Sequence, residues 1–165
     1  MRIGIALGSN LGDRLANLRI AREAVVDLAA NRSVLASPVY ETEPVNCEPG
    51  AAKFLNAVIE IEYDGDPTEL LEKLIRIEES LGRDRAHARN VSRKIDIDLL
   101  YADDLVINNE RLQLPHPRMH EREFVLRPLA DIRPDLVLSN QSKTVRELLS
   151  ETGGSVKVVA SPEQW

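Results

Sequence analysis

The chain has 165 residues, close to the roughly 150 residues of one domain, and its 43% hydrophobic and 29% charged residues are typical of a globular protein. A formal net charge of −6 argues against general binding to nucleic acid or to an anionic membrane surface. No apolar run approaches the roughly 18 residues of a membrane span. The single cysteine, Cys47, excludes an intrachain disulfide and a cysteine zinc cluster. We therefore expect one domain over residues 1–165, cytoplasmic and monomeric, with neither nucleic acid nor membrane as a partner.

Hydrophobic periodicity predicts six elements in the first hundred residues. Alternating or continuous apolar residues indicate strands, and apolar residues three and four positions apart indicate helices. The second helix has a strong start, because Asp66 can cap it and Pro67 suits its first position. The predicted strands are 2–7, 33–40, 54–63 and 95–100, and the predicted helices are 13–30 and 67–81.

The order of these elements, β-α-β-β-α-β, is that of a ferredoxin-like α+β unit. Two helices would cover one face of an antiparallel sheet, and later segments would cover the other face or leave it open. Asp103-Asp104 predicts a hairpin turn into 105–107, and helices are expected near 121–127 and over 143–150. We assign no role to residues 153–165. The expected fold is thus a ferredoxin-like βαββαβ sandwich with an added β-hairpin and C-terminal helices.

The most informative strand carries two acids, Asp96 and Asp98. Strand alternation places both carboxylates on one face, about 7 Å apart. Two carboxylates that project together repel each other unless a cation lies between them, and their hard oxygens suit Mg²⁺ together with substrate phosphates. On spacing alone, a solvated outer strand face explains the pair equally well.

The loop before this strand is strongly basic. Residues 83–94 hold Arg83, Arg85, Arg89, Arg93 and Lys94 against a single acid. Arginines grip phosphate oxygens in fork geometry, so a basic loop that leads into paired carboxylates favours a metal–polyphosphate site. A charged loop with no ligand is the alternative.

The other candidates have weaker signals. Phe54 and Asn56 share the strand face opposite the apolar residues, so a ring and an amide could lie beside the acids and suit a flat, hydrogen-bonding heterocycle. Ordinary surface filling also explains Phe54. The turn from Gly8 to Gly12 matches neither common phosphate-loop spacing. His116, between two prolines, is as readily structural as functional.

Seven segments in order make the chain resemble a known family. They include Ala-Leu-Gly-Ser-Asn-Leu-Gly-Asp at 6–13, Arg-Lys-Ile-Asp-Ile-Asp-Leu-Leu at 93–100 and Leu-Pro-His-Pro-Arg at 114–118. The others are 40–44, 54–57, 77–83 and 121–129. The set is similar to 6-hydroxymethyl-7,8-dihydropterin pyrophosphokinases, over residues 6 to 134.

The resemblance implies an enzyme of folate biosynthesis that transfers pyrophosphate from ATP to the pterin hydroxymethyl group and releases AMP. It implies that Asp96 and Asp98 hold two Mg²⁺ ions and act in catalysis with Arg83 and Arg93. The implied pterin-binding residues are Gly8, Thr42, Pro44, Val45, Phe54, Asn56 and Phe124. The implied ATP-binding residues are Glu78, Arg83, Arg93, Arg111, Gln113, His116 and Arg122.

The chain departs from the family pattern in one place. Where the family commonly has Trp and then Gly-Pro before the arginine, this chain has Asn90, Val91 and Ser92. Two other functions stay open: another Mg²⁺-dependent phosphoryl or nucleotidyl transferase, and a ferredoxin-like domain that binds nucleotide without chemistry. The products formed from ATP distinguish the three.

Overall fold

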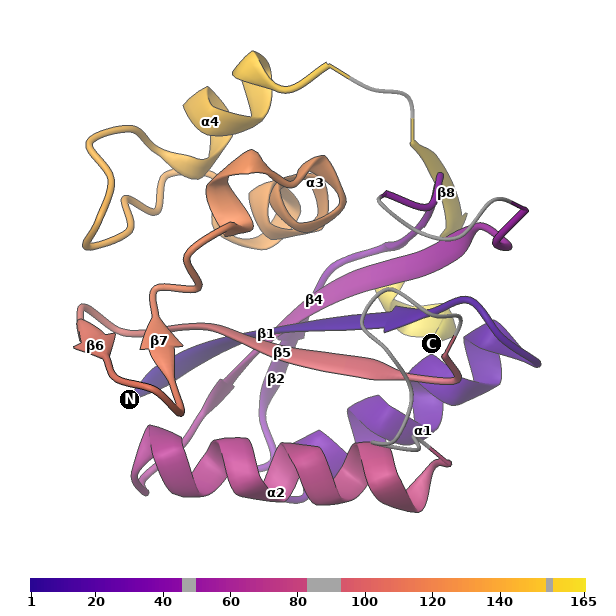
Figure 1. Cartoon of the computed structure of the whole chain (residues 1–165), viewed down its shortest axis with the longest axis horizontal. Helices are drawn as coiled ribbons and strands as arrows, with labels where there is room; N and C mark the ends of the chain where they lie inside the picture. The colour runs from indigo at the N-terminus through magenta and orange to yellow at the C-terminus, as the bar shows by residue number, and fades with distance from the viewer. Residues whose placement is uncertain (46–49, 83–92, 154–155) are drawn as a thin grey trace.

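The computed structural model describes residues 1–45, 50–82, 93–153 and 156–165, and one sheet organises them (Figure 1). Within these residues the sheet has six strands, all paired antiparallel, in the order β5-β1-β4-β3-β8, with β2 beside β4. The strands are β1 (Arg2–Ser9), β2 (Val34–Ala36), β3 (Val39–Thr42), β4 (Phe54–Glu62), β5 (Asp96–Ala102) and β8 (Lys157–Ala160). The predicted α+β fold is confirmed, while the single-domain assignment stays a prediction.

The predicted strand 33–40 is two strands, β2 and β3, separated at Ser37 and Pro38. Proline has no N–H to donate, so a continuous ladder cannot run through Pro38. Ser37 bridges the gap, because its N–H donates to Val58 O at 2.9 Å and its Oγ accepts from Val58 N at 3.0 Å. Both short strands therefore stay aligned on β4.

Helices α1 (Arg14–Val26) and α2 (Pro67–Ser80) cover one face of the sheet (Figure 1). The expected cap of α2 is present, with Thr68 N donating to Asp66 Oδ1 at 2.6 Å. Helix α1 ends four residues before its predicted end, because Ala30 N donates to Glu62 O of β4 at 2.9 Å and the chain turns toward the sheet. The apolar residues of β1, β4 and β5 pack beneath both helices.

Helices α3 (Glu123–Ile132) and α4 (Val145–Glu151) lie over the opposite face (Figure 1). They bury a second apolar cluster that includes Val58, Tyr101 and Leu129. Helix α3 runs five residues beyond the predicted 127, because Leu129 continues its buried stripe. These helices cover the part of the sheet near Gly4, where the Tyr101 ring occupies the space that a side chain would fill.

A hairpin and the C-terminal tail add to the sheet and its two helix layers. An added hairpin is present, but it is not the predicted one. The chain turns at 103–104 as expected, yet β5 does not pair with the residues that follow; instead β6 (Ile107–Asn108) pairs with β7 (Gln113–Leu114) in a separate two-stranded sheet. The tail, for which the sequence predicts no role, forms β8 on the sheet edge and ends in a short 3₁₀ helix, Pro162–Gln164. In the described parts of the chain, no helix is long and apolar enough to cross a membrane.

Candidate active site

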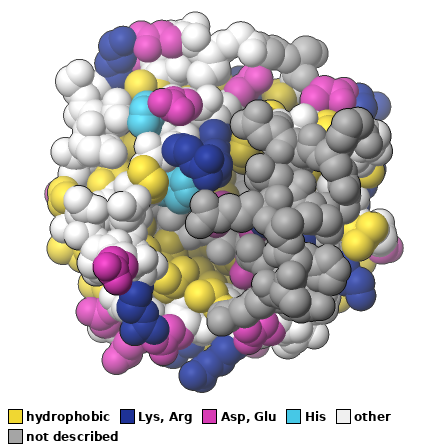
Figure 2. Space-filling model, viewed as in Figure 1, with side chains coloured by type: hydrophobic (Ala, Val, Ile, Leu, Met, Phe, Trp, Pro, Cys, Tyr) yellow, Lys and Arg dark blue, Asp and Glu magenta, His cyan; other side chains and the backbone are white. Residues whose placement is uncertain are grey.

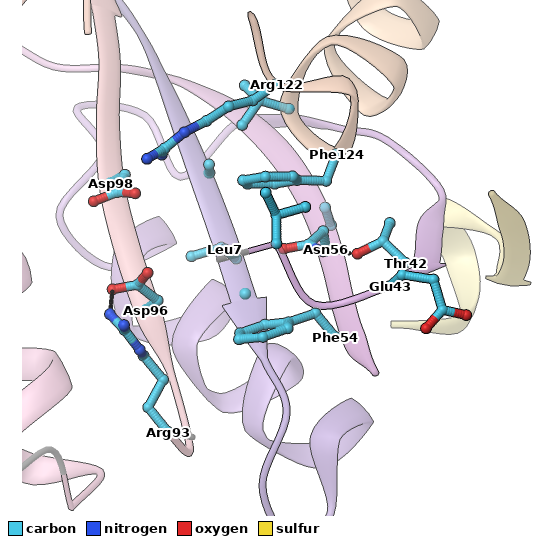
Figure 3. Close-up of a pocket in the computed structure, with 15 residues that line it drawn as sticks. Leu7, Thr42, Glu43, Phe54, Asn56, Arg93, Asp96, Asp98, Arg122 and Phe124 are labelled. Carbon is cyan, nitrogen blue, oxygen red and sulfur yellow. Dashed lines mark hydrogen bonds and ion pairs between the residues drawn. The ribbon is translucent and has the colours of Figure 1, made fainter. Parts of the chain in front are cut away.

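The half of the sheet that α3 and α4 leave uncovered forms the floor of a pocket. On strand β1, Gly8 lies between Asn56 of β4 and Asp96 of β5. Two residues back, Ala6 lies beside Asp98. All five residues line one pocket at this end of the sheet. Asn56, Asp96 and Asp98 are seen in it in Figure 3. The predicted shared face of the acids and Asn56 is confirmed by this register.

Small side chains on β1 keep the floor of the pocket open. A Cβ on Gly8 would lie 2.9 Å from Asn56 Oδ1, closer than side-chain carbons normally approach. Asn56 cannot easily give way, because its Nδ2 donates to Thr42 Oγ1 at 2.7 Å in a buried hydrogen bond. Glycine at this position therefore leaves room for the amide and for whatever the pocket holds.

Two phenylalanine rings stand on opposite sides of this pocket. Phe54 comes from β4, Phe124 comes from α3, and their rings leave a slot between them (Figure 3). Val45 also lines the slot, whereas Pro44 is not among the described residues that do so. An aromatic slot with a hydrogen-bonding amide at its inner end suits a flat heterocycle.

Basic groups lie against the two acids. Arg93 Nη1 is 2.9 Å from Asp96 Oδ1. The Arg122 guanidinium stacks 5.5 Å from the centroid of the Phe124 ring and points toward Asp98 (Figure 3). Burial and the neighbouring Arg118 lower the pKa of Arg122, and the charges of Asp98 and Asp96 oppose that change.

A second hollow lies on the other side of Asp98. Arg111, Gln113 and His116 line it together with Asp98, so this carboxylate borders both hollows. Figure 2, which views the molecule from the same side as Figure 1, shows histidine and basic side chains gathered near the middle of the visible surface. Arg111 also pairs with Glu72, at 2.6 Å between Nη2 and Oε1. Three of the predicted ATP-binding residues thus lie together, beside the acids.

Burial holds His116 in its neutral form. Desolvation, followed by the positive charges of Arg122 and Arg118, lowers the pKa of His116 to about 4. Its Nδ1 accepts a hydrogen bond from Arg118 N at 3.2 Å, which assigns the ring proton to Nε2. The imidazole can therefore donate to an oxygen from Nε2 without carrying a charge.

Glu78 has a different setting from the other predicted ATP-binding residues. Its side chain is buried, 4% exposed, and Oε1 accepts from Ile97 N at 2.7 Å. Ile97 is on β5 between the two acids. Glu78 lines neither hollow among the described residues and instead holds the edge of the acidic strand.

The basic loop is only partly within the described residues. Arg83 and the departures at Asn90, Val91 and Ser92 lie outside them. At its described end, Arg93 is fixed by Asn10, a residue that the sequence alone does not single out. Asn10 Oδ1 accepts from Arg93 N at 2.8 Å, and Asn10 N donates to Arg93 O at 3.2 Å. The small residue Ala6 was missed as well, although its place on β1, two before Gly8, is a readable signal.

An α+β sheet with paired carboxylates, an aromatic slot and a bordering basic hollow defines a group-transfer enzyme for a flat acceptor and a phosphorylated donor. The chain matches the sequence model of the 7,8-dihydro-6-hydroxymethylpterin-pyrophosphokinase family over residues 4–134. It belongs to this family.

Individual relatives agree with the family match. A 2-amino-4-hydroxy-6-hydroxymethyldihydropteridine pyrophosphokinase from Haemophilus influenzae is 38% identical over 158 residues, 96% of this chain and 97% of that protein. A protein of the same name from Bacillus subtilis is 47% identical over 128 residues, 78% of this chain and 75% of that protein.

The fold agrees with solved structures. A triple mutant of HPPK-DHPS from Plasmodium falciparum, crystallised with SDX-DHP, superposes with a TM-score of 0.72 at 17% identity. The match covers 91% of this chain and 44% of that chain, so this chain spans less than half of the solved one. At this identity, the likeness supports the fold alone.

Proposed function

We propose that the protein transfers the terminal pyrophosphoryl group of ATP to the hydroxymethyl oxygen of 6-hydroxymethyl-7,8-dihydropterin, with release of AMP, in folate biosynthesis. Membership of the pyrophosphokinase family supports this activity. The observation that carries it is the aromatic slot between Phe54 and Phe124 directly beside the Asp96–Asp98 pair. An acceptor stacked in the slot would have its hydroxyl next to the acids.

The slot fits a pterin better than a simple apolar ligand. A pterin is flat and carries amide-like donors and acceptors along one edge. Asn56 and Thr42 offer polar atoms at the inner end of the slot, and Gly8 leaves space beside them. Hydrogen bonds there would orient the ring and direct its hydroxymethyl group toward the acids. Gly8, Thr42, Pro44, Val45, Phe54, Asn56 and Phe124 are the proposed pterin-binding residues.

The acids fit a magnesium site that the substrate completes. Mg²⁺ is commonly held by one or two carboxylates together with substrate phosphates rather than by a full protein cage. The described residues contain no group of three or more His, Cys, Asp or Glu side chains placed to hold a metal. Two carboxylates, Asp96 and Asp98, on one strand face match the substrate-completed kind of site. We propose that they hold two Mg²⁺ ions, which when bound would neutralise phosphate charge and make the hydroxyl more acidic.

The basic residues would position the triphosphate. The acceptor oxygen forms a bond to the β-phosphorus, and the bond from that phosphorus to the bridging oxygen of the α-phosphate breaks. The hydroxyl proton goes to solvent, and AMP leaves. Arg93 and Arg83 would offset charge on the transferred oxygens. The proposed ATP-binding residues are these two with Arg111, Gln113, His116 and Arg122. Glu78 belongs to the proposed set as the residue that would hold the strand carrying the acids.

We further propose a cytoplasmic monomer whose partners are these two small molecules. The co-substrate ATP is abundant in the cytoplasm. Light scattering coupled to size-exclusion chromatography measures the oligomeric state directly.

One assay tests the proposed activity. The protein is mixed with the pterin alcohol, ATP and Mg²⁺, and nucleotide and pterin products are separated by ion-exchange chromatography. We expect equal amounts of AMP and pyrophosphorylated pterin, and no product when EDTA is present. ADP or free pyrophosphate would identify another transferase. ATP binding with no turnover would identify a nucleotide-binding domain. Any of these outcomes contradicts the proposal.

A further inference from the structure

Helix α3 turns one face toward β3, and that face carries three functional groups. Phe124, Arg127 and Asp131 are three and seven residues apart, which places them within about 60° around the helix axis. The Phe124 ring is one wall of the slot. The orientation of this wall therefore depends on how α3 is rotated about its own axis.

Arg127 and Asp131 meet a single residue of β3, Tyr40. The Tyr40 hydroxyl donates to Asp131 Oδ2 at 2.5 Å, and Arg127 Nε donates to the same hydroxyl at 3.2 Å. Arg127 Nη2 closes the triangle on Asp131 Oδ1 at 2.8 Å, and the Arg127 guanidinium lies 5.6 Å from the centroid of the Tyr40 ring. We call these three residues the slot cluster.

Tyr40 is well placed to fix the position of α3 relative to the sheet. It is buried, with 4% of its surface exposed, and it is the cross-strand partner of Asn56. Thr42, which accepts the Asn56 hydrogen bond, lies two residues further along β3 on the same face. The residue that holds α3 thus belongs to the strand that also holds the polar end of the slot.

We propose that the slot cluster sets the rotation of α3 and thereby the spacing of the Phe124 wall from Phe54 and Asn56. Tyr40, Arg127 and Asp131 are positioning residues for the acceptor, because none of the three lines the slot. This inference rests on the proposed function, since it names residues that tune binding of the pterin.

The same helix provides a matched control cluster at its other end. Arg133 follows α3, and its Nη2 donates to Glu60 Oε1 at 2.5 Å. The Tyr101 hydroxyl donates to Glu60 Oε2 at 2.7 Å. This tyrosine–carboxylate–arginine cluster also joins α3 to the sheet. It lies nine residues from Phe124, about 13 Å along a helix, and none of its members lines the slot.

The experiment compares the removal of one hydroxyl from each cluster. Tyr40→Phe is expected to raise the KM for the pterin alcohol about fivefold or more, in line with the loss of a hydrogen bond to a charged group. The KM for ATP and kcat are expected to stay within about twofold of wild type. Tyr101→Phe is expected to lower thermal stability and leave all three kinetic parameters within about twofold.

A conservative pair at Asp131 adds a second readout. Asp131→Asn keeps an oxygen that accepts from Tyr40, so its pterin KM is expected to lie closer to wild type than that of Asp131→Ala. All variants are assayed well below their melting temperatures, so that only folded protein is compared.

Each outcome bears on a different claim. A wild-type pterin KM in Tyr40→Phe, or an equal rise in Tyr101→Phe, would overturn the positioning role while the wild-type enzyme still makes AMP. No AMP from the wild-type protein would instead overturn the proposed function. The two failures are therefore distinguishable in one set of assays.

Discussion

Asp96 and Asp98 have the same side chain but different surroundings. Asp96 forms an ion pair with Arg93 and faces the aromatic slot. Asp98 borders both the slot and the hollow that contains Arg111, Gln113 and His116. Asp98 is therefore the carboxylate that would lie between donor and acceptor, and its charge is the one we expect turnover to need most.

Asp98→Asn keeps the shape of the side chain and removes its charge. We expect kcat to fall at least about 100-fold, because the neutral amide stabilises a bound cation poorly. Circular dichroism melting should change little, since Asp98 faces a hollow. The matched control is Asp103→Asn, just after the same strand, where the carboxylate pairs with Arg2 on the surface. Equal kcat values for the two variants would remove Asp98 from the proposed metal site.

The neutral state of His116 gives a pH prediction. Its folded pKa of about 4 lies below the ordinary value of 6.5. Between these two pH values the unfolded chain binds more protons, so the free energy of unfolding falls as pH falls from 6.5 toward 4. His116→Gln removes this titration.

The measurement is urea unfolding of both proteins across that pH window. We expect the wild type to lose stability faster than His116→Gln as the solution becomes more acidic. Parallel pH profiles would mean that the folded and unfolded pKa values of His116 are alike.

Sequence reasoning worked where it depended on one strand at a time. Alternation within 54–63 and 95–100 is enough to place Phe54 and Asn56 on one face and the two acids on one face. The role of Gly8 could not be predicted in this way, because it depends on how β1 is aligned with its neighbouring strands. Only this alignment shows that a Cβ on Gly8 would collide with the Asn56 side chain. Asn10 was missed for a similar reason, since its partner Arg93 is 83 residues away. The site roles themselves stay predictions.

At the scale of elements, the acidic strand β5 is an edge strand that one helix side chain supports. β5 pairs with β1 on one side only in the described sheet. On the other side Glu78 of α2 accepts from Ile97 N, between the two acids. A buried carboxylate that takes a backbone N–H fixes the strand at the point where the acids project.

Replacement of Glu78 tests whether it supports the strand or contacts ATP. Glu78→Ala leaves Ile97 N without this partner, so we expect a loss of about 1–3 kcal/mol in unfolding free energy and a lower kcat. Glu78→Gln keeps an accepting oxygen and is expected to recover most of both. Urea unfolding measures the unfolding free energy, and steady-state kinetics measure kcat and the KM for ATP. A raised KM for ATP in Glu78→Gln, with stability near wild type, would favour direct ATP contact instead.

Element boundaries were less predictable than element types. The break between β2 and β3 has a local cause in Pro38, but Ser37 could be recognised as the bridge only from its bonds to Val58. Helix α1 ends early because Ala30 bonds to Glu62 of β4, a tertiary contact with no sequence pattern. Strand β8 contains the consecutive apolar residues Val158, Val159 and Ala160, so its sequence has no alternation that could indicate a place at the sheet edge.

At the scale of the whole molecule, the sheet has one fully covered face and one half-covered face. α1 and α2 bury the first, whereas α3 and α4 cover only the part of the second near Gly4 and Tyr101 (Figure 1). The other half is left for the slot and the acids. The position of α3 therefore decides both where the second core ends and where the site begins.

The tail ties the far edge of the sheet to the helix layer. Trp165 is 7% exposed, and its Nε1 donates to Ser37 O at 2.9 Å, at the break between β2 and β3. Its ring lies 4.9 Å from the Arg22 guanidinium of α1. Arg19 Nη2 also donates to Gln164 O, at 2.5 Å. One side chain thus joins α1, β2 and β3.

Trp165→Ala would open a large cavity at this junction. We expect a loss of about 3–5 kcal/mol in unfolding free energy, typical of a buried aromatic residue replaced by alanine. Trp165→Phe keeps most of the packing and loses the hydrogen bond to Ser37 O, so its loss should be smaller. Because Trp165 does not line the slot or the adjoining hollow, KM values for both substrates should stay within about twofold of wild type. An unchanged unfolding midpoint in Trp165→Ala would show that the tail does not stabilise the sheet edge.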